Sequence, residues 1–197
     1  MDKVRNQQRR RAILEATVEI IGREGPGQVT HRAVAAEAGV PLAATTYYFA
    51  SKESLFNEAL RLSVRSDLDE LEALARSMSE SPASVEAFAH SIASFLASQL
   101  RRRRTTVVAQ YELVLEAARH SSLRPAARAS TAAYTRLCQA MLERIGSGEP
   151  AQDAPLLVAL MDGLLLDQLS ASTAPFDVGR LTDKLRRFIA GLVVASS

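Results

Sequence analysis

The chain has 197 residues, of which 47% are hydrophobic, 23% charged and 5% aromatic, so wholesale disorder is excluded. The length is enough for one large domain or two small ones. Its single cysteine, Cys138, excludes a disulfide-built secreted scaffold and favours the cytoplasm. The longest apolar run, Leu156 to Leu166, contains Asp162 and is shorter than the roughly 20 residues that cross a bilayer. We therefore expect no membrane span, and the polar N-terminus is not typical of a signal peptide.

Charge is unevenly distributed, although the net charge is only +2. Residues 1–52 hold eight Lys or Arg against five acidic residues, whereas the remaining 145 residues hold sixteen against seventeen. Within residues 1–11 there are five basic residues and one acid, which is the composition of an arm that lies along DNA phosphates. The alternative interpretation, a solvated and frayed terminus, is equally open.

Apolar residues recur at spacings of three and four along the whole chain, which predicts an all-α fold. A first helix with Ile13 and Ile21 on its apolar face is expected to be ended by Gly22, Gly25, Pro26 and Gly27. Thr30 should cap a short second helix that ends at Gly39, and Pro41 should open a third that runs to about Tyr48. Six further helices are expected at about 51–78, 85–99, 107–118, 125–145, 155–171 and 178–194.

The segment THRAVAAEAGVPLAATTYYFASKESLF places two short helices on either side of a Gly39-Val40 turn. This spacing is typical of a helix-turn-helix, in which the first helix crosses the DNA backbone and the second enters the major groove. Short helical hairpins also occur in proteins that never bind DNA, so the spacing alone does not establish the function.

Three blocks resemble the TetR family of bacterial transcriptional regulators: ILEATVEIIGREG, THRAVAAEAGV and YYFASKESLF. The resemblance implies a three-helix N-terminal helix-turn-helix domain over residues 7–67, with the motif itself at about 30–49. It also implies a six-helix C-terminal ligand-binding and dimerisation domain over residues 68–197. The chain departs from the family at Pro41, Leu42, Ala44 and Thr46, so its base-reading chemistry is expected to be atypical.

The resemblance implies that Thr30 and Lys52 bind phosphates and that Arg32 reads a base. The third helix contains no Arg, Lys, Asn or Gln, so its apolar side chains suit thymine methyl groups, with Thr45 or Thr46 adding a hydroxyl. For Tyr48, a phosphate contact and a core position with a satisfied hydroxyl are equally open. The predicted DNA-binding residues are Thr30, Arg32, Pro41, Leu42, Ala43, Ala44, Thr45, Thr46, Tyr47, Tyr48 and Lys52.

A ligand pocket for a small, mostly apolar effector is expected among the helices between residues 85 and 171. Large, adaptable side chains on the inward stripes would line it, and a few polar atoms would orient the ligand. For any one of these residues, ordinary core packing is the favoured alternative. The predicted ligand-binding residues are Phe95, Gln99, Tyr111, Glu112, Tyr134, Cys138, Met141 and Met161.

The last two helices carry more apolar surface than one core needs, which predicts a homodimer closed by four helices. The predicted interface residues are Leu156, Leu160, Gly163, Leu164, Leu181, Leu185, Phe188 and Leu192. The run Arg101 to Arg104 is interpreted as a solvated helix end rather than a second nucleic-acid site. Asp162 and Asp167 are more typical of boundary residues with partners than of acids that face a ligand.

No catalytic, cofactor or metal signature is present, because the three histidines are far apart and no Cys or carboxylate lies at ligand spacing. We therefore expect a non-enzymatic, cytoplasmic, homodimeric repressor that binds double-stranded operator DNA and a small-molecule effector. A helical protein-binding adaptor without DNA binding, and an activator of the same family, remain as alternatives.

Overall fold

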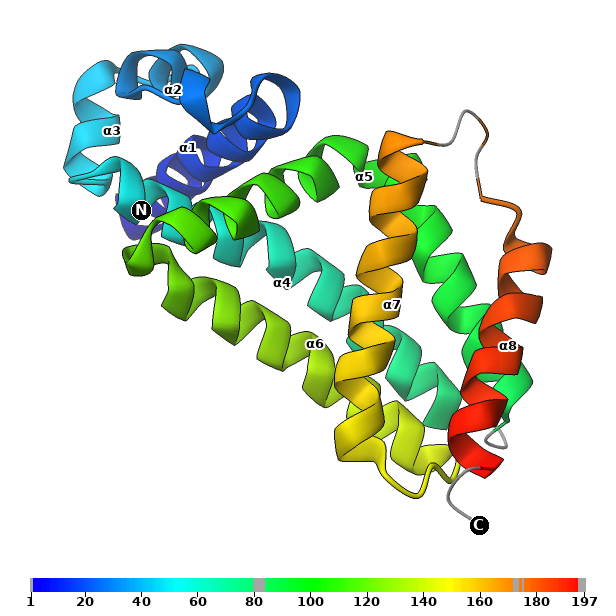
Figure 1. Cartoon of the computed structure of the whole chain (residues 1–197). Coiled ribbons are helices and arrows are strands. Elements are labelled where there is room, and N and C mark those ends of the chain that lie inside the picture. Colours follow the sequence, from blue (N-terminus) through cyan, green and yellow to red (C-terminus); the bar gives the residue numbers. More distant parts are fainter. Residues whose placement is uncertain (1, 80–83, 172–173, 175, 195–197) are drawn as a thin grey trace. The chain divides into compact units, whose positions relative to one another are not determined.

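The computed structural model describes residues 2–79, 84–171, 174 and 176–194. This part of the chain is helical and contains no strand, which confirms the all-α prediction. The short 3-10 helices η1 (Pro26–Gln28) and η2 (Ser121–Leu123) complete it. The α-helices in Figure 1 are α1 (Asp2–Glu24), α2 (His31–Glu37), α3 (Leu42–Tyr48), α4 (Lys52–Ser79), α5 (Val85–Arg119), α6 (Arg124–Arg144), α7 (Pro150–Ser170) and α8 (Val178–Val194).

Helix α5 covers two of the helices expected from the sequence. Its backbone leaves the helical region at Arg103, where φ is −138° and ψ is 25°. Helix α7 begins at Pro150 rather than near Pro155, because proline is well suited to a first helical turn. Helix α1 begins at Asp2, so the basic N-terminal segment is the first part of a helix.

Helix α1 ends within the predicted glycine and proline segment, but Gly22 itself lies inside the helix, so its part in that prediction is wrong. The helix continues to Glu24, and the turn that follows uses Gly25 at φ 86°, which lies in the left-handed region that favours glycine. A Cβ atom at position 22 would overlap the backbone carbonyl of Thr105 in α5. Glycine is therefore required here for close helix packing.

Two compact units make up the chain. The first contains residues 1–66 and 104–130, and the second contains residues 67–103 and 131–197. Three helices, α4, α5 and α6, pass from one unit to the other. The unit boundary in α5 coincides with the non-helical residue Arg103.

The core of the first unit is formed by α1, α2, α3 and the first half of α4. Ile13, Val34, Phe49 and Leu60 are at most 2% exposed, as their apolar spacing predicts. Polar contacts join the helices around this core: Arg10 pairs with Glu58 at 3.0 Å, linking α1 to α4. The helix-turn-helix therefore rests on an apolar core, and the ion pair between Arg23 of α1 and Glu37 of α2 adds a polar contact to it.

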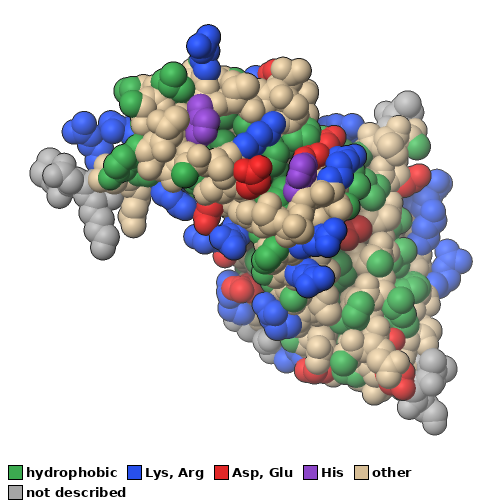
Figure 2. All heavy atoms as spheres, turned by 60° about the vertical axis from the view of Figure 1, so that its left-hand side comes forward, with side chains coloured by type: hydrophobic (Ala, Val, Ile, Leu, Met, Phe, Trp, Pro, Cys, Tyr) green, Lys and Arg blue, Asp and Glu red, His purple; other side chains and the backbone are tan. Residues whose placement is uncertain are grey.

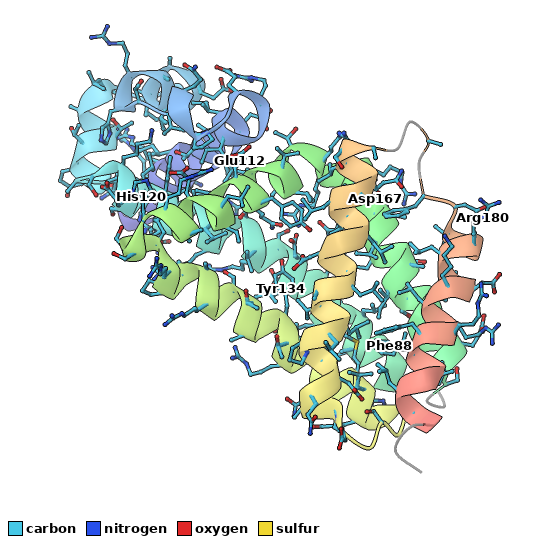
Figure 3. The ribbon with its side chains drawn as sticks, in the orientation of Figure 1. Phe88, Glu112, His120, Tyr134, Asp167 and Arg180 are labelled. Carbon is cyan, nitrogen blue, oxygen red and sulfur yellow. The ribbon has the colours of Figure 1, made fainter. Side chains whose placement is uncertain are left out.

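The core of the second unit is formed by the second half of α4, the first half of α5, the second half of α6, and α7 and α8. Phe88, labelled in Figure 3, is fully buried, as are Ile92, Leu142 and Ile189. At the turn between α6 and α7, the Ser147 hydroxyl donates to Asp153 at 2.5 Å. This hydrogen bond satisfies two polar side chains in a mostly apolar region.

Candidate functional site

Helices α2 and α3 form a helix-turn-helix in the first unit. Thr30 is the N-cap of α2, and its hydroxyl oxygen accepts from the Ala33 backbone N–H at 3.1 Å. The turn passes through Gly39 at φ 62°, in the left-handed region that glycine adopts without strain. Val34 and Phe49 are buried beneath the motif and fix both helices on the core.

Most of the predicted DNA-binding side chains lie on the exposed surface of this motif. Ala44 and Tyr48 are half-buried, whereas Thr45 is fully buried and its hydroxyl donates to the Leu42 carbonyl. The inclusion of Thr45 in the DNA-binding set is therefore wrong, because its place in the helical repeat turns it toward the core. The exposed members are Thr30, Arg32, Pro41, Leu42, Ala43, Thr46, Tyr47 and Lys52.

The two tyrosines at the end of α3 have different surroundings. Tyr47 is 79% exposed and stacks edge-on against Tyr48, with ring centroids 5.0 Å apart. The Tyr48 hydroxyl donates to Asn6 Oδ1 of α1 at 3.1 Å. Tyr48 therefore has a structural role within the unit, while the Tyr47 hydroxyl remains available to a phosphate.

Several cations of this unit are available to a polyanion. Arg10 and Arg23 are ion-paired with acidic side chains, whereas Arg32 and Lys52 form no ion pair with any residue that the structure describes. The Lys52 ammonium group lies 5.2 Å from the centroid of the Phe56 ring, which positions it by a cation–π contact. Blue and red side chains alternate over the face shown in Figure 2, so no large basic patch dominates it.

A buried carboxylate that the sequence analysis missed organises the second unit. Asp67 of α4 is 3% exposed, forms an ion pair with Arg103 and accepts a hydrogen bond from the Tyr134 hydroxyl at 2.9 Å. Tyr134 projects from α6 toward α4 (Figure 3). Burial, together with the neighbouring Asp67 charge, raises the pKa of Tyr134 above its ordinary value, so the phenol remains a donor.

The sequence contained a signal for this Asp67 cluster. Asp67 falls seven residues after Leu60 and four before Leu71, so it lies on the apolar stripe of α4. The interpretation of Arg101 to Arg104 as solvated is wrong for Arg103, because its side chain is only 22% exposed and is paired.

A second polar link joins α4 to α5, about one turn later in α4 and one turn earlier in α5. The Glu70 carboxylate accepts from Ser98 Oγ at 2.7 Å and from Gln99 Nε2 at 3.0 Å. Beside it is an open cavity of about 430 Å³. Its lining residues are Glu70, Ala73, Leu74, Ser91, Ser94, Phe95, Ser98, Arg101 and Arg102.

Phe95 is the one predicted ligand-binding residue that lines this cavity. Phe95, Gln99, Cys138, Met141 and Met161 are buried in the second unit, and Tyr134 is half-buried there. Tyr111 and Glu112 belong to the first unit, where both are half-buried. A pocket shared by all eight residues stays a prediction.

Two family models match the chain. Residues 13–59 match the model described as "Bacterial regulatory proteins, tetR family". Residues 83–195, more than half of the chain, match "Tetracyclin repressor-like, C-terminal domain". The chain belongs to the TetR family.

Solved structures of TetR-type proteins match over nearly the whole chain. The multidrug binding protein EbrR complexed with imidazole is 31% identical, with a TM-score of 0.73 and 94% of each chain covered. A TetR family member from Streptomyces coelicolor A3 is 32% identical, with a TM-score of 0.73 and coverage of 94% of this chain and 98% of that one. A transcriptional regulator from Rhodococcus sp. Rha1 is 24% identical, with a TM-score of 0.77 and coverage of 94% of this chain and 96% of that one. At this identity the likeness shows the fold alone. None of the curated proteins compared with the chain matched it.

The apolar surface of this TetR-family chain on α7 and α8 is smaller than the sequence indicated. Leu181 and Leu185 are 5% and 1% exposed within their own unit, so the prediction that they form the dimer interface is wrong. They lie on the side of α8 that packs into the core. Leu156 is 58% and Phe188 37% exposed, Gly163 is exposed, and Leu160, Leu164 and Leu192 are half-buried.

Asp162 and Asp167 are both exposed on α7, and Asp167 is labelled in Figure 3. Within the described ranges, no three or more His, Cys, Asp or Glu side chains are grouped to hold a metal ion. None of the helices in that part of the chain combines the length and apolarity needed to cross a membrane.

The buried thiol of Cys138 is expected to resist modification in the folded protein. Burial, with a smaller contribution from the Asp162 charge, raises its pKa to about 12. Between about pH 9 and pH 12 the thiol is ionised in the unfolded chain but still protonated in the folded one. The stability that the protonated thiol supports is therefore fully present below about pH 9, and the free energy of unfolding falls as the pH rises toward 12. Reaction with a chromogenic disulfide near neutral pH should be at least about 100-fold slower in buffer than in concentrated urea. A rapid stoichiometric reaction in buffer would contradict this burial.

Proposed function

We propose that this TetR-family chain is a transcriptional repressor that binds a palindromic operator as a homodimer in the cytoplasm and leaves it when a small molecule binds. The observation that carries the proposal is the exposed surface of the helix-turn-helix. Thr30 and Arg32 at the start of α2 and the outer side chains of α3 are exposed while the other faces of both helices are buried. Two copies related by a two-fold axis would place these surfaces on successive major grooves.

The operator is read mainly by apolar contacts in this proposal. Helix α3 has no side chain that makes a bidentate contact with guanine or adenine. Leu42 and Ala43 are exposed at its start and suit thymine methyl groups, and the Thr46 hydroxyl, which donates to the Ala43 carbonyl at 3.2 Å, retains a lone pair for DNA. Guanine, if it is read directly, is assigned to Arg32.

Arg32→Ala should weaken binding to the cognate duplex by about 1–3 kcal/mol and relax the preference at one base pair of each half-site. The side chain is exposed and has no ion-pair partner in the described part of the chain, so its removal should leave the fold intact. The measurement is fluorescence anisotropy with cognate and scrambled duplexes, each at two salt concentrations. The matched control is Lys52→Ala, which should weaken both duplexes similarly and flatten the salt dependence, because a phosphate contact contributes counterion release without base information. An equal loss on both duplexes for Arg32→Ala would remove its assignment as base reader.

The effector is proposed to bind in the second unit. The cavity beside Glu70 supports this, since its volume falls within the range of small-molecule sites and it combines an aromatic ring with polar groups. EbrR, which is 33% identical over 94% of this chain in its complex with ethidium, supports an effector that is aromatic and largely apolar. The effector would bias the geometry of the helices that enter the DNA-binding unit.

Selection of duplexes from a random pool by the purified chain tests the function as a whole. A palindromic site should be recovered, the complex should contain two copies of the chain, and a compound that stabilises the free protein should weaken that complex. Recovery of no duplex would contradict the proposal and favour a protein-binding adaptor. A reporter gene that is activated rather than silenced would point to an activator of the same family.

A further inference from the structure

The cavity beside Glu70 has a charged end and an apolar section. Its lining residues on α5 run from Ser91 to Arg102, a stretch of about 16 Å along the helix. Arg101 and Arg102 belong to the last turn of this stretch, and Phe95 lies about two turns before them. A ligand that fills the cavity therefore meets cations at one end and an aromatic side chain along its body.

Helix α4 adds further apolar surface to the same cavity. Ala73 and Leu74 line it, one turn after Glu70. The volume of about 430 Å³ is large enough for a small organic molecule, and the opening gives that molecule a route from solvent. The cavity thus offers space and a mixed apolar and charged wall.

The charged groups that are free to meet a ligand here are positive. Each oxygen of the Glu70 carboxylate already accepts a hydrogen bond, from Ser98 Oγ at 2.7 Å and from Gln99 Nε2 at 3.0 Å. Arg101 and Arg102 are exposed, and neither forms an ion pair with a residue in the described ranges. Two arginines and one glutamate give the lining a net charge of +1, which favours an anion over a cation.

Arginine makes two kinds of contact with an aromatic acid. Its planar guanidinium group donates two parallel hydrogen bonds to one carboxylate, and it also stacks on the face of an aromatic ring. The Phe95 ring in the wall favours a second aromatic ring packed against it. An aliphatic acid would gain the hydrogen bonds alone, so the wall suits an aromatic acid better.

We propose that the effector is an aromatic carboxylate. Arg101 and Arg102 hold its carboxylate group, and Ala73, Leu74 and Phe95 contact its ring system. This inference rests on the proposed function, because it specifies the ligand class of the cavity assigned to the effector there. The charge of the ligand is the property that tests it.

The test compares three probes that share a naphthalene ring system and differ in charge. Naphthylacetate is an anion, naphthylacetamide is neutral, and naphthylethylamine is a cation near neutral pH. By isothermal titration calorimetry, the wild-type chain should bind naphthylacetate at least about fivefold more tightly than the amide, and the amine most weakly. This comparison needs no variant, so it remains informative if a substitution impairs folding. Equal affinities, a preference for the amine, or failure of naphthylacetate to bind would overturn the inference.

The double variant Arg101→Gln/Arg102→Gln tests the two cations. It should bring the affinities for naphthylacetate and the amide within about twofold of each other, because neutral amides replace both guanidinium groups. The matched control is Arg136→Gln/Arg180→Gln, which removes the same charge from two exposed positions of the second unit outside the lining and should keep the preference. A preference that persists in the first variant, or that is lost in the control, would contradict the assignment of Arg101 and Arg102.

Ala73→Trp tests the location. Ala73 is exposed, so the larger side chain should be tolerated by the fold, and it would occupy the apolar section of the cavity. Both naphthylacetate and the amide should bind at least about tenfold more weakly. Ala140→Trp, at an exposed position of α6 outside the lining, is the matched control and should leave both affinities unchanged. Unchanged affinities in Ala73→Trp would show that the probes bind elsewhere.

Operator binding without any probe separates this inference from the proposed function. A chain that binds its operator but shows no preference for naphthylacetate keeps its regulatory function and loses the aromatic carboxylate as its ligand class. A chain that binds no duplex but shows a preference dependent on Arg101 and Arg102 keeps the ligand site and loses the regulatory function.

Discussion

Phe188→Arg should convert the proposed homodimer into monomers. Phe188 is 37% exposed on α8, and the neighbouring exposed side chains Lys184 and Arg187 are already cationic. An arginine in the seam would be buried without a partner beside other positive charges. A cost of about 3–5 kcal/mol would raise the dissociation constant by at least about 100-fold. Sedimentation velocity at micromolar protein should show a single monomeric species.

Leu115→Arg is the matched control for this experiment. Leu115 is 53% exposed, but it lies on α5 in the first unit, away from α7 and α8 in sequence. The same gain of charge should leave the oligomeric state unchanged. A wild-type chain that sediments as a monomer, or a Phe188→Arg variant that remains dimeric, would show that α8 does not form the interface.

Asp67→Ala should lower the free energy of unfolding by about 3 kcal/mol, the typical effect of removing one partner of a buried ion pair. The substitution leaves the largely buried Arg103 guanidinium without its counter-ion and the Tyr134 hydroxyl without its acceptor. Equilibrium urea unfolding followed by far-UV circular dichroism measures the loss. All proteins must be compared at one protomer concentration, because the proposed dimer would contribute to the measured stability.

Tyr134→Phe separates the two contacts of this cluster. It removes one hydrogen bond to Asp67 and keeps the ion pair, so a loss of about 1 kcal/mol is expected. If Asp67→Ala cost no more than Tyr134→Phe, the ion pair would contribute nothing beyond the hydrogen bond. The cluster would then not stabilise the place where α5 breaks.

The helical fold and the DNA-binding motif were predictable from the sequence, because both depend on local rules. The positions of Thr30, Gly39 and the apolar residues of α1 determine where short helices begin, end and pack. A resemblance over three short blocks then identified the TetR family. The same resemblance assigned Arg32, Tyr47 and Lys52 to DNA, and the structure places all three on the surface.

Only the tertiary structure decided which apolar and charged side chains meet. Leu185 and Phe188 look alike on the helical repeat of α8, yet one is buried in its own unit and the other is exposed, because the neighbouring helices determine which part of a wide apolar stripe is covered. Similarly, Arg103, one of four consecutive arginines, lies at the break in α5 and pairs with Asp67, which is far away in sequence. The local spacing places Asp67 on the buried stripe of α4, but it does not identify Arg103 as its partner, because long-range pairing depends on how the helices pack in three dimensions.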